Sequence, residues 1–419
     1  MRKRTGVAMA VALFMVGGAV STGIASAHEN PAGAGQDVSA GAATSTDRGG
    51  MVFVQSNDPE QNSVLAFRRA ADGSLTAAGE FRTGGRGGSQ RDNPFDPLAS
   101  QESLVFDRAH QMMIAVNAGS NSVTTFRVRG EKLTDPHTVS SGGDFPTSIA
   151  VSGETVYVLN AGGTTNVTGF RITHSGLSRL RHSARELGVT NDAVPMFTDS
   201  PPQVGFSPDG KHLLVTTKSA NTIEVFAVGH DGMLSAQAVS TKSVGDVPFS
   251  FVFDHSGHLL VTEAAKSGVT SYALEDDGTL ETITPSVESG QQVLCWIAQA
   301  GQFFYGTNPG SSTISLYTVD GEGRVALGGD NGVIANAGGA AAVAAVAAAA
   351  ADADKAPGAG PIDLAATADG GLLYVQNTLA GTVEGFRVGA DGSLSLVTTL
   401  DKGLPVFADG SGMEGIVVW

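Results

Sequence analysis

Residues 213–234 read LLVTTKSANTIEVFAVGHDGML. The stretch contains a β-rich run, a polar turn, an alternating run that ends in an aromatic residue, and an Asp-Gly pair. Alternation with period two, as in Ile223-Glu-Val-Phe226, is what a half-buried strand requires. An Asp-Gly pair such as Asp231-Gly232 favours a tight hairpin turn. The stretch therefore predicts short antiparallel strands joined by hairpins.

The same phrase recurs along the chain. Its aromatic residue falls at seven positions, which are Phe67, Phe126, Phe170, Phe226, Tyr272, Tyr317 and Phe386. Three of the six intervals between them are 44, 46 and 45 residues long. Asp-Gly pairs close the phrase at Asp72, Asp231, Asp277 and Asp391. A repeat of this length accommodates four short strands, as in the blades of a β-propeller.

A short apolar strand precedes every unit except the first. Six such strands are found at residues 104–106, 149–151, 204–206, 251–253, 296–298 and 364–366, and a seventh lies at residues 415–419. We expect residues 416–418 to pair with residues 52–54 and close a ring, which removes two open sheet edges. The sequence thus predicts an all-β, seven-bladed β-propeller with four-stranded blades. An open β-solenoid is the alternative, but it leaves residues 416–419 without a partner.

The N-terminal residues have the features of a targeting segment. A basic group at residues 2–4 precedes an apolar run at residues 7–19 and an Ala-Ser-Ala cleavage signal at residues 25–27. This order indicates a secretory signal peptide over residues 1–27. A disordered leader is expected over residues 28–50, followed by the propeller over residues 51–419. We expect a secreted, extracellular monomer with no membrane anchor.

Two insertions stretch the repeat. Residues 83–101 are rich in glycine and arginine and join the first blade to the second. Residues 337–360 contain an alanine tract, which suits a small surface helix or a loop. We assign no function to the second insertion.

Composition excludes several classes of function. The chain has 25 basic and 41 acidic side chains, for a formal net charge of −16. Nucleic-acid binders need a basic face, so nucleic acid is not expected as a partner. The single cysteine, Cys295, cannot form an internal disulfide, and cysteine-rich zinc sites are excluded. We expect neither a metal nor a cofactor.

Several phrases resemble a known propeller family. Residues 115–123, 156–162 and 204–211 are similar to the YVTN-type repeat, and residues 388–394 resemble the blade ends of lactonase-type propellers. That family contains 6-phosphogluconolactonases and 3-carboxy-muconate cyclising enzymes. The resemblance implies the propeller fold over residues 51–419. It also implies a site at the central channel, built in the family's enzymes from histidine, arginine and glutamate.

Most of those catalytic positions hold other residues in this chain. The fourth blade opens with Ser200-Pro-Pro-Gln203, the fifth with Pro248-Phe249-Ser250, and the last with Pro361-Ile362. The resemblance carries over only Glu263, which falls where the family has its glutamate. A lone carboxylate lacks the cations that would hold an anionic substrate or stabilise an oxyanion.

We expect the channel mouth to be bounded by residues near the starts of the inner strands: Gln203, Phe249, Glu263, Trp296 and Asp363. Three acidic residues next to inner strands, Glu102, Asp363 and Glu414, are expected to point into the channel. If these three residues and Glu263 line the mouth, their mutual repulsion would raise some of their pKa values. Such a site disfavours phosphorylated lactones and suits a cation or a neutral, hydrogen-bonding ligand.

Three functions remain open. The leading interpretation is an exported lactonase-like propeller with a degenerate site, which acts as a binding or scaffold protein. Its partner would be a small lactone or sugar-like molecule, or an extracellular protein. The rival is an active lactonase or muconate-type cyclising enzyme that uses Glu263 as base and the loop arginines Arg82, Arg86 and Arg91 as anion holders. The third is a purely structural surface protein.

Overall fold

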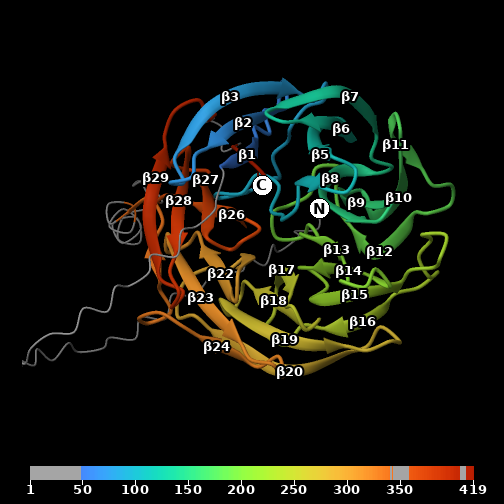
Figure 1. The fold of residues 1–419 in the computed structure, drawn as a ribbon. Helices are drawn as coiled ribbons and strands as arrows, with labels where there is room; N and C mark the ends of the chain where they lie inside the picture. Colours follow the sequence, from blue (N-terminus) through green and yellow to red (C-terminus); the bar gives the residue numbers. More distant parts are fainter. Residues whose placement is uncertain (1–48, 340–341, 343–357, 406–411) are drawn as a thin grey trace, which may run out of the picture. The chain divides into compact units, whose positions relative to one another are not determined.

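The computed structural model describes residues 49–339, 342, 358–405 and 412–419. The expected signal peptide, nearly all of the leader and most of the insertion at 337–360 lie outside these residues. Seven antiparallel sheets surround a central axis, as Figure 1 shows. The all-β seven-bladed propeller is therefore confirmed. Among the described residues, no helix has both the length and the apolar character needed to cross a membrane.

The blades follow one another along the chain, and each is built of strands that succeed one another from the axis outward, with an added outer strand in two blades. Blade 1 contains β30 (Ile416–Val418), β1 (Gly50–Gln55), β2 (Ser63–Arg69) and β3 (Leu75–Arg82). Blade 2 contains β4 (Leu104–Asp107), β5 (Met112–Asn117), the 3-10 turn η1 (Ala118–Ser120), β6 (Ser122–Arg129) and β7 (Lys132–Ser140). Blade 3 contains β8 (Asp144–Ser152), β9 (Thr155–Gly162), β10 (Thr164–Thr173) and β11 (Gly176–Arg179), with β12 (Arg185–Thr190) also paired to β10. Blade 4 contains β13 (Val204–Phe206), β14 (His212–Thr217), β15 (Thr222–Ala227) and β16 (Val239–Lys242).

The remaining three blades repeat this plan. Blade 5 contains β17 (Pro248–Phe253), β18 (Leu259–Glu263), β19 (Gly268–Leu274) and β20 (Leu280–Glu288). Blade 6 contains β21 (Trp296–Ala300), β22 (Phe303–Asn308), β23 (Thr313–Val319) and β24 (Val325–Leu327), with β25 (Ala335–Asn336) also paired to β23. Blade 7 contains β26 (Pro361–Ala366), β27 (Leu372–Asn377), β28 (Thr382–Val388) and β29 (Leu394–Leu400).

The ring closes through the C-terminal strand. In the antiparallel pair of β30 and β1, Val52 lies opposite Val418 and Val54 lies opposite Ile416. The Trp419 ring packs edge-on against Phe53 of the same blade and Phe106 of the next. The expected pairing of residues 416–418 with residues 52–54 is confirmed, and the open solenoid is excluded.

The repeated phrase has the same structural role in each blade. Its aromatic residue lies on the third strand from the axis and is buried in all seven blades. The glycines of the four Asp-Gly pairs have positive φ angles between 81° and 96°, which glycine adopts without steric cost. The aspartate before each glycine accepts a hydrogen bond from the backbone N–H two residues later, as in Asp231 and Met233. These local contacts stabilise the hairpins that the sequence predicts.

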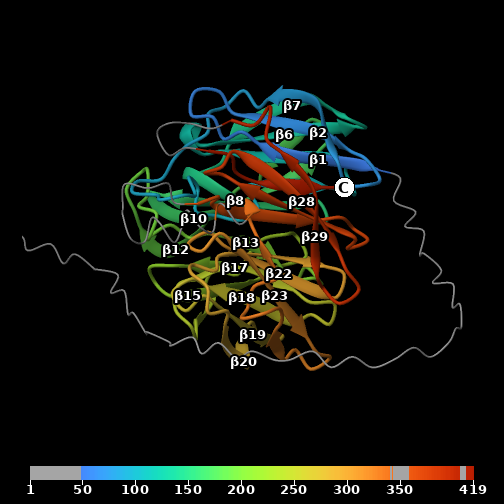
Figure 2. The ribbon, with the colours of Figure 1, turned by 90° about the vertical axis from the view of Figure 1, so that its left-hand side faces the viewer.

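A second, unexpected repeat joins neighbouring blades. A tyrosine on the second strand of one blade donates its hydroxyl to the carbonyl oxygen of an Asp-Gly glycine in the next blade. The pairs are Tyr157 with Gly232 at 2.9 Å, Tyr305 with Gly392 at 2.8 Å, and Tyr374 with Gly73 at 2.7 Å. The last pair crosses the junction between blades 7 and 1, where Figure 2 shows β28 and β29 beside β1.

Candidate functional site

One end of the central channel is covered by the first insertion. Residues 95–101, which we name the plug segment, lie across the end at which the inner strands start. Leu98 and Ala99 are fully buried there, and Ala99 packs in the same apolar cluster as Phe249 and Trp296. Gln101 makes two hydrogen bonds with the backbone of Ile297 in blade 6, at 2.9 and 3.2 Å. The insertion therefore spans the ring from blade 2 to blade 6.

Further hydrogen bonds fix the plug segment to other blades. Ser100 donates its hydroxyl to the Thr147 carbonyl of blade 3 at 2.9 Å, and its own carbonyl accepts from the Trp296 indole at 2.7 Å. The backbone N–H of Leu98 donates to the Glu414 carboxyl at 2.9 Å. These contacts with blades 1, 3 and 6 hold the covered end closed.

Several charged groups are buried in the plug segment or next to it. The Asp96 carboxylate accepts from the backbone N–H groups of Leu98 and Ala99 at 3.0 and 2.7 Å. Burial raises the pKa of Glu414 well above its ordinary value, and the nearby Asp96 carboxylate raises it further. Burial lowers the pKa of Lys218 to about 8, an effect that Asp96 opposes. Lys218 donates to the Phe197 carbonyl and stands 5.3 Å from the centre of the Phe249 ring.

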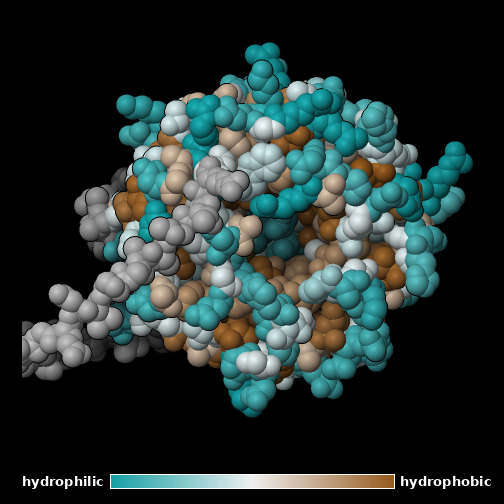
Figure 3. Space-filling model, in the orientation of Figure 1, coloured by the Kyte–Doolittle hydropathy of each residue, from teal (hydrophilic) through white to brown (hydrophobic). Residues whose placement is uncertain are grey.

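The rest of the channel forms a cavity that opens at the opposite end. Its volume is about 640 Å³, and its walls come from the inner strands of blades 2 to 6. The cavity reaches the surface beside Arg108, Ala109 and Gly153, which are exposed and belong to the turns after the inner strands. Figure 3 shows the hollow at the centre of this face. We name it the axial cavity.

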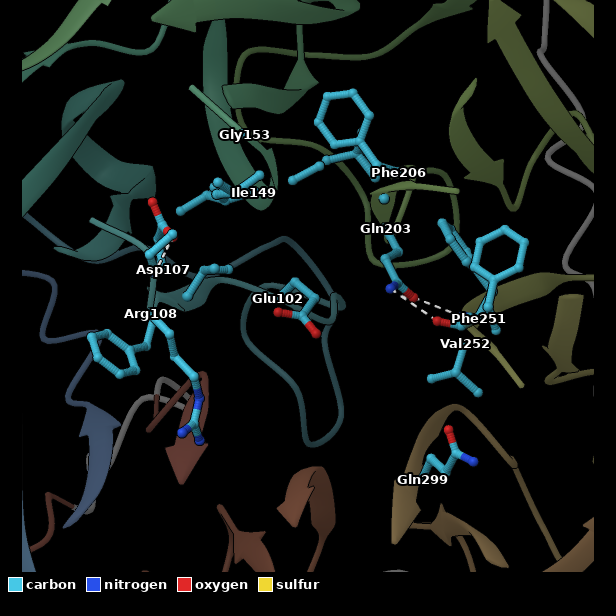
Figure 4. Close-up of a pocket in the computed structure, with 18 residues that line it drawn as sticks. Glu102, Asp107, Arg108, Ile149, Gly153, Gln203, Phe206, Phe251, Val252 and Gln299 are labelled. Atoms are coloured by element: carbon cyan, nitrogen blue, oxygen red, sulfur yellow. Dashed lines mark hydrogen bonds between the residues drawn. The ribbon is translucent and has the colours of Figure 1, made fainter. Parts of the chain in front are cut away.

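Glu102 lies at the closed end of the axial cavity, directly after the plug segment. Figure 4 shows its carboxyl group between the two walls, and within the described chain that group has no hydrogen-bond partner. The backbone of Glu102 has a φ of 64°, in the left-handed region that residues with a β-carbon rarely adopt. Burial raises the pKa of this carboxyl to about 7. Glu102 is therefore a partly buried acid that titrates near neutral pH.

Two of the other expected residues also lie on the channel wall. Gln203 lines the axial cavity, but its amide is engaged with the backbone of Phe251 at 3.1 and 2.7 Å, as the dashed lines in Figure 4 show. Asp363 lines an adjoining cavity of about 200 Å³ together with Glu102. The Asp363 oxygens accept from the backbone N–H groups of Leu364 and Ile416. Burial raises the pKa of Asp363 well above its ordinary value, and the Glu102 carboxyl adds to this effect.

The remaining expected residues do not reach the axial cavity. Phe249 and Trp296 are buried beneath the plug segment, with ring centroids 4.9 Å apart. Glu414 is buried in contact with Leu98 of the same segment. The structure thus groups Glu102, Gln203 and Asp363 on the channel wall and separates them from the other four residues. The expectation of a mouth at the strand-start face is corrected, because the plug segment occupies that face.

Glu263, the residue implied by the family resemblance, is enclosed within blade 5. Its carboxylate accepts hydrogen bonds from the Ser243 hydroxyl at 2.8 Å, the Gly245 N–H at 2.7 Å and the Thr270 hydroxyl at 2.7 Å. Its side chain is fully buried. Within the residues that the structure describes, no arginine, lysine or histidine hydrogen-bonds to this carboxylate. The geometry indicates a structural role in holding the loop before β17.

The three loop arginines also lie away from the cavity. Arg82, Arg86 and Arg91 are exposed. Arg86 donates to the Gly119 carbonyl at 3.1 Å, and Arg91 pairs with Asp192. None of them lines the axial cavity. The charge that the family's enzymes use on their substrates is therefore not replaced from this insertion.

Sequence reasoning missed the residues at the open end of the cavity. Asp107, Arg108 and Gln299 line it, but they lie at the ends of the inner strands β4 and β21 or in the polar turn that follows. No signal in the sequence separates these turns from the other hairpins of the repeat. Within the described parts of the chain, no group of three or more histidine, cysteine, aspartate or glutamate side chains is arranged to hold a metal ion.

The comparisons with known proteins agree with this architecture. Residues 186–297 match the model of the "Lactonase, 7-bladed beta-propeller" family, which confirms the resemblance to lactonase-type propellers. No curated protein matches the chain.

Solved structures share the fold at low sequence identity. A candidate 6-phosphogluconolactonase of Bacteroides fragilis is 16% identical, with 90% of this chain and 99% of that chain covered and a TM-score of 0.62. The periplasmic gluconolactonase of Pseudomonas aeruginosa is 16% identical, with 85% and 97% covered and a TM-score of 0.61. A Lactobacillus plantarum protein is 14% identical, with 88% and 99% covered and a TM-score of 0.65.

Proposed function

Starting from the lactonase-type propeller fold, we propose that this protein binds a small molecule in the axial cavity and has lost the catalytic site of the family's enzymes. The observation that carries the proposal is the position of the plug segment. It covers the strand-start end of the channel, where Glu263, Phe249 and Trp296 are buried, and the cavity opens toward the opposite face, beside Arg108 and Gly153. A substrate in the cavity is therefore kept from Glu263.

The electrostatics of the cavity argue against turnover of anionic lactones. Hydrolysis of a lactone places negative charge on an oxygen, which enzymes stabilise with cations or aligned N–H donors. The cavity presents Glu102 at its closed end, and Arg108 at the rim donates to the Val418 carbonyl at 3.4 Å. Like charges repel most strongly where water is scarce, so a phosphorylated lactone is disfavoured. An uncharged lactone or sugar-like molecule remains compatible.

The sequence supports a place for this binding protein outside the cell. The signal-peptide features at residues 1–27 fit export, and an exported binding protein would meet its ligand in solution. An extracellular protein partner at the exposed turns around the open end is the alternative to a small molecule. We propose the small molecule because a cavity of about 640 Å³ lies within the roughly 300–1,000 Å³ typical of small-molecule sites.

A paired assay tests the proposal. Purified protein is incubated with a panel of aldonolactones and muconolactones, and ring opening is followed by pH-stat titration. The same compounds are tested for binding by isothermal titration calorimetry. We expect binding of at least one uncharged lactone and no turnover above the spontaneous rate.

The variant Glu263→Gln separates the two functions. Turnover in the wild type that disappears in Glu263→Gln would show an active enzyme and overturn the proposal. Thr270→Val is the matched control, since it removes one hydrogen bond to the same carboxylate and leaves the carboxylate in place. Loss of turnover in both variants to the same extent would point to a packing effect, which also requires an active wild-type enzyme and contradicts the proposal.

A further inference from the structure

We infer that the ligand of the axial cavity is an organic cation, an amine with an apolar body whose ammonium group pairs with Glu102. This inference rests on the proposed small-molecule function and narrows it to one charge class. It follows from which polar groups on the wall are already engaged, from the aliphatic side chains and the volume of the cavity, and from the backbone geometry of Glu102.

The acidic and amide side chains on the wall, other than Glu102, have partners in the protein. The Asp107 carboxylate accepts from the Ala109 N–H at 3.0 Å and pairs with the His110 ring. The Gln203 amide is engaged at both ends with the Phe251 backbone. These side chains form hydrogen bonds within the turns and the inner strands. They would have to break those hydrogen bonds to bind a ligand.

The groups nearest the open end are also engaged. Arg108 donates to the Val418 carbonyl and lies over the Phe106 ring, 5.9 Å from its centre. The Gln299 amide nitrogen contacts the His255 ring and donates to the Gly301 carbonyl at 3.1 Å. Glu102 is therefore the charged side chain of the described lining that has no partner of its own. A polar group of a ligand in this cavity would therefore interact mainly with the Glu102 carboxyl.

The charge at the closed end favours a cation. Glu102 and Asp363 share the adjoining cavity, and both Asp363 oxygens already accept backbone N–H groups. Arg108, the basic side chain of the described lining, lies at the exposed rim, where it donates to the Val418 carbonyl and does not pair with Glu102. A ligand that brings one positive charge pairs with a partly buried carboxyl group that has no other partner in the described lining, and it favours the ionised form of that group. An anion meets repulsion at the same place.

The walls indicate that the cation is organic. Phe106, Phe206, Phe251 and Phe253 belong to the lining, but their side chains pack in the apolar clusters between blades, so the apolar part of the wall is mainly aliphatic. Burial of an apolar ligand body against such walls stabilises the complex in proportion to the apolar area removed from water. A bare metal ion would find only Glu102 uncommitted, which is too few ligands for the six or more oxygens that Ca²⁺ takes.

The backbone of Glu102 shows how the carboxyl is held in place. Gln101 is anchored to blade 6 by two hydrogen bonds, and Leu104 begins the inner strand of blade 2. Between them, Glu102 is held at a φ of 64°. Such conformations are strained in residues with a β-carbon, and they are concentrated at functional sites. The strained backbone turns the carboxyl toward the cavity.

Calorimetry with three probes of matched size tests the inference. The probes are 2-phenylethylammonium, the neutral 2-phenylethanol and the anion phenylacetate, titrated at pH 8 into the full-length protein. We expect the ammonium to bind at least ten-fold more tightly than the alcohol and the anion to show no binding. The affinity for the ammonium should rise between pH 6 and pH 8, as Glu102 loses its proton.

Variants identify the group responsible. Glu102→Gln should reduce the affinity for the ammonium at least ten-fold, abolish its rise with pH and leave the alcohol unchanged. Glu60→Gln removes an exposed carboxylate elsewhere and should change nothing. If Glu102→Gln fails to fold, Glu102→Gly serves instead, since glycine suits a φ of 64°.

The outcomes separate the two claims. Equal affinity for the ammonium and the alcohol, or ammonium binding that survives in Glu102→Gln, would overturn the organic-cation inference. Binding of an uncharged lactone in that case would leave the proposed function standing. Failure of every probe and every lactone to bind would overturn both.

Discussion

The raised pKa of Glu102 makes the stability of the folded protein depend on pH. Its pKa is raised by burial to about 7, compared with 4.5 in the unfolded chain. The folded protein therefore keeps a proton that the unfolded protein releases between these pH values. The stability that this proton contributes is fully present below pH 4.5 and is lost as the pH rises through 7.

The variant Glu102→Gln should remove this dependence. Glutamine stays neutral, so the variant and the wild type should have similar free energies of unfolding at pH 5. At pH 8 the variant should be more stable, by a difference on the order of 3 kcal/mol at most. Urea denaturation at pH 5, 6, 7 and 8 measures both curves. Parallel curves would mean that Glu102 has no raised pKa.

At the residue scale, the sequence identified acidic residues that lie near the channel. It did not indicate which of them face the axial cavity. It singled out Glu102, Asp363 and Glu414 because they adjoin inner strands. The sequence did not indicate that Glu414 contacts the plug segment, while Glu102 and Asp363 lie on the channel wall. Within that segment Leu98 and Ala99 are adjacent apolar residues without periodicity, and they are buried only because distant residues such as Trp296 surround them.

At the scale of the strands, the sequence was more informative. Alternation and Asp-Gly turns are local signals, and they predicted the hairpins and the burial of the third strand. The tyrosine contacts between blades could not be predicted in this way. Tyr374 and Gly73 are 301 residues apart, and nothing in either stretch indicates the other.

The tyrosine contacts should contribute measurably to stability. Tyr374→Phe removes the 2.7 Å bond and leaves the Gly73 carbonyl without this donor. We expect a loss of about 1–2 kcal/mol in the free energy of unfolding, since an unmade buried hydrogen bond costs about this much. Tyr317→Phe is the comparison, because the Tyr317 bond to Val287 is longer, at 3.3 Å, and should cost less. Equal losses in the two variants would contradict the assigned role.

At the scale of the whole molecule, the closing strand determines whether the ring exists. Removal of residues 411–419 reopens an edge of blade 1 and removes the Glu414 contact with Leu98. We expect the shortened chain to lose its cooperative thermal transition, as followed by circular dichroism. Trp419→Ala keeps the β30 pairing and should show a cooperative transition at a lower temperature. A cooperative transition near that of the wild type in the shortened chain would refute this role for β30.

The contact between Leu98 and Glu414 joins residues that are 316 positions apart. During synthesis the plug segment leaves the ribosome long before Glu414 is added. A nascent chain therefore has no closed cavity until β30 has emerged, whatever blades have already formed. If the axial cavity binds a ligand as proposed, a chain that lacks β30 should be unable to compete for that ligand with a chain that contains it.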